Sequence, residues 1–239
     1  MRQFETENYI FNFTEGSAAE RDIEKIAAEQ EACFAYICDV LQVKPSFRIT
    51  YFLCETPEQV GAIYRDNEPC NGFASVPDKV YAVYNDQVKC VGFHEDAHLL
   101  SYCLNRPLSA AVREGLAMFF DRKWWGISNQ EWAEYYLKKG MFAGIREYLK
   151  DEVFFDIHCG ISYPIAGCLT EYLIHTYGIE KYLAFWQWRG DMAAAMEESF
   201  GVTADELDQA FRAYLKLFRM DEELEARIAE LVAKKVEAV

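Results

Sequence analysis

His94-Glu95-Asp96-Ala97-His98 is the stretch that decides the fold, and it stands in the longer run from Gln87 to Leu104. This run has the composition of a buried helix. In an α-helix, residues four apart lie on the same face, one turn above the other. His94 and His98 can therefore reach the same metal ion, and Glu95 projects to the side where a bound water would sit.

A third metal ligand is expected from Glu114, sixteen residues beyond His98. Pro107 ends the first helix, and the segment from Ser109 to Phe120 predicts a second helix that folds back and presents Glu114 beside the two histidines. Two histidines, one carboxylate and an open fourth position are what a catalytic zinc site needs. His-Glu-x-x-His on a helix is a pattern of zinc hydrolases, with Glu95 as the general base.

With these residues in place, the chain resembles the gluzincin metallopeptidases, and more narrowly the peptidase MA-like group. The resemblance lies in His94-Glu-x-x-His98 and in Arg113-Glu-Gly-Leu-Ala-Met-Phe-Phe120, and it extends weakly from about residue 11 to about residue 218. It implies a zincin-like fold, a Zn²⁺ cofactor, and hydrolysis of a peptide or small amide substrate.

The resemblance also implies a Tyr or His on the helical side that donates a hydrogen bond to the reacting oxygen. Tyr163 is the first candidate for this role and His158 the second, while His175 at a helix end is expected to be structural. The chain departs from thermolysin-like enzymes at Met118, where they have an Asp that orients a ligating histidine. Asp121 or a backbone carbonyl would have to replace it.

A second departure concerns the substrate's amino terminus. The Gly-x-Met-Glu-Asn signature of zinc aminopeptidases is absent, and Asn71-Gly-Phe-Ala-Ser75 is only a loose echo of it. Capture of a free amino terminus is therefore not supported.

The pattern of elements predicts an α+β protein. We expect an N-terminal α+β subdomain over residues 1–105, ending in the metal helix, and a helical subdomain over 106–239 with the third ligand; together they would form one catalytic unit. Alternating stretches predict a strand at 4–14, a second at 47–54, and one or two short strands over 73–84 with a turn at Pro77-Asp78. For Lys79 to Tyr84, an exposed sheet edge, implied by the resemblance, and an ordinary core strand both stay open.

Helices are predicted from about 18 to 43, where Ser17 is the cap and Pro45 the stop, and from Thr56 to about Tyr64, with Pro57 in the first turn. In the second half, Gly126 is expected to end the second motif helix, and Ser128/Glu131 and Thr203/Glu206 are capping boxes. The remaining expectations are a helix within 141–150, a loop from 151 to 160, helices over 162–178, 180–188 and 192–200, and an amphipathic tail over 221–239.

Composition and charge exclude several kinds of partner. The 239 residues carry a formal net charge of −15, which argues against binding to nucleic acid or to anionic membranes. The eight cysteines show no Cys-x-x-Cys spacing, so we expect reduced thiols and a cytoplasmic protein. We find no signal core at the N-terminus and no run long enough to span a membrane. The oligomeric state is not fixed by the sequence.

Three functions are compatible with these patterns. The first is a zinc-dependent peptidase of the gluzincin type. The second is a non-catalytic zinc-binding scaffold or peptide-binding module with the same fold, although such a protein has no need of Glu95. The third is an amidohydrolase that acts on a non-peptide substrate.

Overall fold

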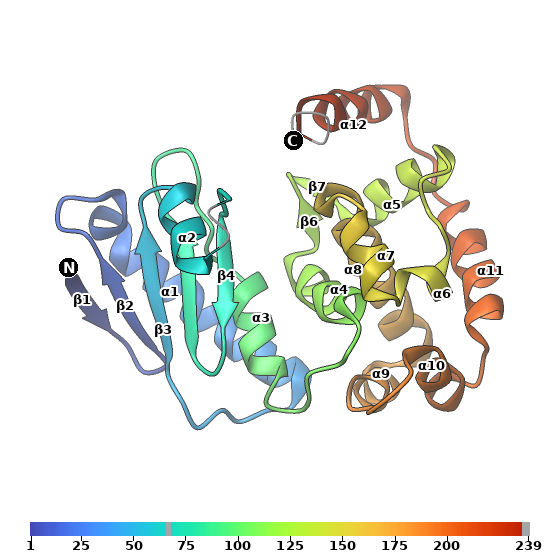
Figure 1. Ribbon diagram of the computed structural model, residues 1–239, viewed down its shortest axis with the longest axis horizontal. Coiled ribbons are helices and arrows are strands. Elements are labelled where there is room, and N and C mark those ends of the chain that lie inside the picture. Colours follow the sequence, from blue (N-terminus) through green and yellow to red (C-terminus); the bar gives the residue numbers. More distant parts are fainter. Residues whose placement is uncertain (66–67, 236–239) are drawn as a thin grey trace. The chain divides into compact units, whose positions relative to one another are not determined.

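The computed structural model describes residues 1–65 and 68–235, and the chain divides into two compact units, Met1–Leu104 and Asn105–Val239. The first unit is a mixed five-stranded sheet with helices, and the second is mostly helical (Figure 1). The predicted α+β class is therefore confirmed. The predicted loop residue Asn67 and tail residues 236–239 lie outside the described part of the chain.

The sheet of the N-terminal unit has a parallel centre and antiparallel edges. Its strand order is β1-β2-β3-β5-β4; β2, β3 and β5 run parallel, while β1 and β4 are antiparallel to their neighbours. The strands are β1 (Arg2–Glu5), β2 (Tyr9–Phe13), β3 (Ile49–Cys54), β4 (Gly72–Ser75) and β5 (Lys79–Val83).

The single strand predicted for residues 4–14 is wrong, because a tight turn divides it into β1 and β2. Thr6 N donates to the carbonyl oxygen of Tyr9 (3.0 Å), and Glu31 accepts from both the backbone N and Nδ2 of Asn8 (2.9 and 2.7 Å). The turn contains neither Gly nor Pro, the residues that most clearly mark a turn, so the sequence around Asn8 gives only a weak signal for it.

The strand that precedes the metal helix is a core strand. β5 lies between β3 and β4, so the edge position implied by the resemblance is wrong for Lys79–Val83 and belongs to β4. Of the one or two short strands predicted for this segment, the structure contains two, β4 and β5.

Two helices of the first unit begin where their caps predict. In α1 (Ala18–Leu41), Ser17 Oγ accepts from Glu20 N, and in α2 (Pro57–Tyr64), Thr56 Oγ1 accepts from Gln59 N. The buried side chains of α1 include Ile26, Cys33 and Ile37, and those of the sheet include Tyr9, Phe11 and Tyr51. Together these apolar residues form the core of the unit.

The metal helix α3 (His94–Ser101) is shorter than the predicted helix over 87–104. Gly92 adopts φ +125°, which is incompatible with a helix, and Tyr84 forms an isolated bridge with Lys89. Helical structure therefore starts at His94 itself.

In the C-terminal unit, α4 (Ala110–Asp121) packs closely against α8 (Cys159–Tyr177). The sequence predicted that this helix ends at Gly126, but α4 ends at Asp121, where Arg122 (φ +63°) is its C-cap. Trp125 (φ +49°) and Gly126 (φ +78°) instead form the turn of a small hairpin, β6 (Lys123–Trp124) and β7 (Ile127–Ser128). Positive φ at both turn residues is typical of a two-residue hairpin turn.

Tryptophans gather beside this hairpin. All five tryptophans of the chain lie in the C-terminal unit, and none in Met1–Leu104. The indole of Trp132 donates to the carbonyl oxygen of Trp124 (2.8 Å), and the rings of Trp125 and Trp132 meet edge to face.

The other helices follow the predicted pattern with one correction. Both capping boxes are confirmed, at Ser128/Glu131 and at Thr203/Glu206. The predicted loop over 151–160 is wrong, since it contains α7 and the first turn of α8. The remaining helices are α5 (Asn129–Lys138), α6 (Ile145–Tyr148), α7 (Asp151–Asp156), α9 (Ile179–Trp186), α10 (Met192–Phe200), α11 (Ala204–Leu215) and α12 (Glu222–Lys235).

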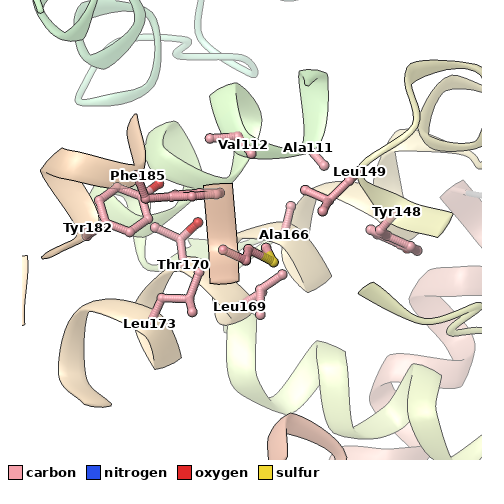
Figure 2. A pocket seen from close by; sticks show the side chains of 11 residues that line it. Ala111, Val112, Tyr148, Leu149, Ala166, Leu169, Thr170, Leu173, Tyr182 and Phe185 are labelled. Carbon is pink, nitrogen blue, oxygen red and sulfur yellow. The ribbon is translucent and has the colours of Figure 1, made fainter. Parts of the chain in front are cut away.

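A small cavity lies in the core of the C-terminal unit (Figure 2). Its lining includes Ala111, Thr170, Tyr182 and Phe185, and its volume is about 10 Å³. This is barely the space of one water molecule, so the cavity cannot admit a substrate. Across residues 1–65 and 68–235, no helix is both long and apolar enough to cross a membrane.

Candidate metal centre

Helix α3 places the two predicted histidine ligands on one face. Four residues at about 100° each bring His98 to within about 40° of His94 around the helix axis. Their ring centroids lie 5.1 Å apart with the planes nearly perpendicular. His98 is buried and His94 is partly buried, so both imidazoles stand close to the protein interior.

Helix α4 carries the third predicted ligand, Glu114, next to a glycine that sets the packing of the helix. A Cβ placed on Gly115 would lie 2.5 Å from Oγ1 of Thr170 and 2.8 Å from the carbonyl oxygen of Ala166. Any side chain at this position would push α4 away from α8. Gly115 therefore permits the close approach of α4 to α8, which fixes the position of Glu114 on α4.

The segment leading into α4 is held by Arg113. Its Nη1 donates to the carbonyl oxygens of Pro107 and Leu108 (2.8 and 2.5 Å), and Asp151 Oδ1 accepts from the backbone N of Ala110 (2.6 Å). Asp151 therefore satisfies the first N–H of the helix, which has no partner within it, and Arg113 ties the preceding loop to the first turn. The first turn of α4 is thus fixed from two sides.

The three predicted ligands form a cluster that could hold a metal ion. One side-chain donor atom from each of His94, His98 and Glu114 lies within 4.8 Å of the other two. Imidazole nitrogen and carboxylate oxygen are both donors that zinc accepts, and two histidines with one Glu leave a tetrahedral ion one open position. The donor set does not by itself identify the metal.

Glu95 is buried beside the edge strand β4. A Cβ placed on Gly72 of that strand would lie 3.4 Å from Oε1 of Glu95 and 3.0 Å from Sγ of Cys90. The absence of a side chain at Gly72 thus permits the close approach of β4 to Glu95 and Cys90.

The predicted hydrogen-bond donors of the second unit occupy defined positions. Tyr163, in the first turns of α8, packs its ring against Phe154 and Trp124, at centroid distances of 5.8 and 5.9 Å. His158 was expected in a loop, but it is the N-cap of α8, where its Nδ1 accepts from Gly160 N (3.0 Å). His175 lies in the last turn of α8, as expected. The roles of Tyr163 and of Asp121 stay predictions.

The sequence interpretation missed the group behind the histidines. Asp96 is fully buried and accepts hydrogen bonds from Tyr9, Tyr51 and Gln30. Burial raises the pKa of the Asp96 carboxyl to about 7, although the three hydrogen bonds oppose that shift. The available signal was the position of Asp96 midway between the two histidines, where a helix packed on a sheet would ordinarily carry an apolar residue.

Comparisons of this chain with models of protein families, with curated proteins and with solved structures found no match. The interpretation of the metal cluster therefore depends on its own residues.

Proposed function

We propose that the chain is a zinc-dependent hydrolase of the gluzincin type, most simply a peptidase that cleaves a peptide or small amide bond. The cluster of His94, His98 and Glu114 is the observation that supports this proposal, together with Glu95 directly after the first ligand. A zincin-like arrangement of the chain is part of the same proposal.

The donor set of the cluster suits zinc. His94, His98 and Glu114 would hold the ion and leave one position for water. A zinc ion bound there would supply a Lewis acid that lowers the pKa of that water towards ~7.

Glu95 is the proposed general base. Its carboxylate takes a proton from the attacking water as the water oxygen bonds to the substrate carbonyl carbon. The same proton then passes to the leaving nitrogen as the carbon–nitrogen bond breaks, so that the products are an acid and an amine. Burial of Glu95 beside β4 keeps its carboxylate in a fixed position for both transfers.

Tyr163 is the proposed donor to the oxygen that gains negative charge. Removal of one such hydrogen bond typically costs about 3 kcal/mol of transition-state stabilisation. The packing of the Tyr163 ring between Phe154 and Trp124 would hold the phenol in one orientation.

The edge strand supports an extended peptide as substrate. Among the described residues, β4 pairs on one side only, with β5. An unpaired strand edge can add a peptide as a further strand through backbone hydrogen bonds. Gly72, on the same strand, lies close to Glu95, so a peptide added at this edge would run near the proposed base.

The decisive experiment combines metal analysis with peptide-library cleavage. The purified protein is expected to bind zinc at about one equivalent and to cleave peptides in a chelator-sensitive way. Glu95→Gln should keep the zinc and lose at least about 10²-fold in rate, while Glu114→Gln should lose zinc as well. Glu24→Gln, an exposed position on α1, is the matched control.

Other outcomes would favour the alternatives. Full hydrolysis by Glu95→Gln would refute the base assignment. Zinc binding with no cleavage of any peptide or amide would identify a scaffold or peptide-binding module. Cleavage of small amides but not of peptides would identify an amidohydrolase of another class.

A further inference from the structure

We propose that Asp96 is a positioning residue whose buried hydrogen bonds set the rotation of helix α3 and so aim His94 and His98 at the metal. The inference rests on the proposed function, because it concerns the orientation of the ligands named there. It assigns a role to the third residue of the motif, which neither binds metal nor moves a proton.

The helix geometry places Asp96 opposite the ligands. Asp96 is two residues from each histidine, and two residues turn an α-helix by about 200°. Its side chain therefore leaves the helix on the side away from His94 and His98. A contact that fixes Asp96 also fixes the direction of both imidazoles.

Three separate elements hold the Asp96 carboxylate. Tyr51 of β3 donates to Oδ1 (2.9 Å), while Tyr9 of β2 (2.5 Å) and Gln30 of α1 (2.9 Å) donate to Oδ2. All four side chains are buried, with exposures of 0% for Tyr9, Gln30 and Asp96 and 1% for Tyr51. Donors that approach both carboxylate oxygens define the orientation of its plane.

Gln30 also fixes the residue two positions before His94. Its Oε1 accepts from the backbone N of Gly92 (2.6 Å), and its Nε2 lies 3.1 Å from the Gly92 carbonyl oxygen. One amide group thus contacts both the chain entering α3 and the buried face of the helix. The start of α3 and its rotation are tied to the same residue.

The polar nature of this contact is the reason to assign it a positioning role. Apolar packing is non-directional, so a leucine at position 96 would hold α3 on the sheet without fixing its angle. A buried carboxylate is costlier to desolvate than a leucine, and a set of apolar residues in place of a whole buried polar group is often neutral or stabilising. A helix of eight residues that carries two ligands needs the angular restraint that hydrogen bonds supply.

The test compares metal binding with folding in variants of the full-length protein. Asp96→Asn keeps the side-chain size but turns an amide NH₂ towards the donors, and the double variant Tyr9→Phe/Tyr51→Phe keeps Asp96 but removes two of its three donors. Tyr84→Phe is the matched control, since its hydroxyl is bound by Asp22 in the same unit (3.0 Å). Zinc affinity is measured by chelator competition, ligand geometry by the visible spectrum of bound Co²⁺, and folding by thermal unfolding of the metal-free protein.

We expect both anchor variants to bind zinc at least about tenfold more weakly and to show an altered Co²⁺ spectrum, while Tyr84→Phe matches the wild type. A folded anchor variant with wild-type zinc affinity and a wild-type Co²⁺ spectrum would overturn the inference, even if its melting temperature fell. If Asp96→Asn does not fold, the double tyrosine variant decides by the same criterion. A wild-type protein that binds neither metal would instead refute the proposed function and this inference with it.

Discussion

The two helices that carry the candidate ligands are held by opposite means. Helix α3 of the N-terminal unit is anchored by a buried polar network around Asp96, whereas helix α4 of the C-terminal unit, beyond the hydrogen bonds at its first turn, is set against α8 by close packing at Gly115. Hydrogen bonds restrain an angle, and close packing restrains a distance. The difference teaches that the two histidines of one unit and the Glu114 of the other are positioned by different kinds of contact, which separate substitutions can remove.

The largest expected loss of stability comes from Gln30→Leu, which removes part of the buried hydrogen-bond network around Asp96. The change removes one donor from Asp96 and both side-chain partners of the Gly92 peptide groups. Buried polar groups that lose their partners should lower the free energy of unfolding by on the order of 3 kcal/mol. Denaturant titration followed by circular dichroism measures this, with Gln209→Leu, at an exposed position of α11, as control. A loss below about 1 kcal/mol would show that the network adds little to stability.

The second-largest loss of stability is expected from Gly115→Ala, which disturbs the close packing of α4 against α8. Helix propensity alone would make this change stabilising by up to about 1 kcal/mol. The 2.8 Å approach of the new Cβ to the Ala166 carbonyl oxygen should reverse the sign and cost about 1–3 kcal/mol. Thermal unfolding decides the sign directly, and a stabilised variant would refute the packing argument.

Gly167→Ala tests the same interface from the partner helix. Its Cβ would lie 2.6 Å from Cβ of Met118 and 2.7 Å from Nδ2 of Asn129. We expect a loss similar to that of Gly115→Ala. A loss of stability at only one of the two positions would mean that the new methyl group clashes with one neighbouring side chain. The distance between α4 and α8 would then not be the cause.

The smallest loss of stability is expected from a substitution outside the contacts that position α3 and α4. Ser128→Ala removes the cap of α5, where Ser128 Oγ accepts from Glu131 N (3.2 Å), and should cost about 1 kcal/mol. Zinc affinity, measured by chelator competition, should not change. Weaker zinc binding by this variant would mean that zinc affinity depends on overall stability rather than on the Asp96 network and the Gly115 packing.

The sequence predicted most of what depends on local signals. The caps Ser17 and Thr56 and the two capping boxes place helix starts correctly, because a side chain that accepts from a nearby N–H acts within four residues. The grouping of His94, His98 and Glu114 was also predictable, since one spacing belongs to a helix face and the other to a family pattern.

The wrong predictions concern helix ends and sheet positions that depend on unusual backbone conformations or on contacts between distant residues. The Gly92 conformation shortens α3, and the positive φ of Arg122 ends α4 before Gly126, although neither follows from apolar periodicity. The edge position of β4 depends on sheet order, which a single strand does not encode. The Asp96 network joins residues up to 87 positions apart, so no local pattern contains it.

The distribution of tryptophan gives the two units separate optical labels. Because every indole lies in Asn105–Val239, intrinsic tryptophan emission follows the unfolding of that unit alone, while far-ultraviolet circular dichroism follows both. Coincident curves from the two probes would mean that the units melt as one cooperative body; separated curves would give each unit its own transition. The protein thus carries a built-in reporter of whether its halves depend on each other to stay folded.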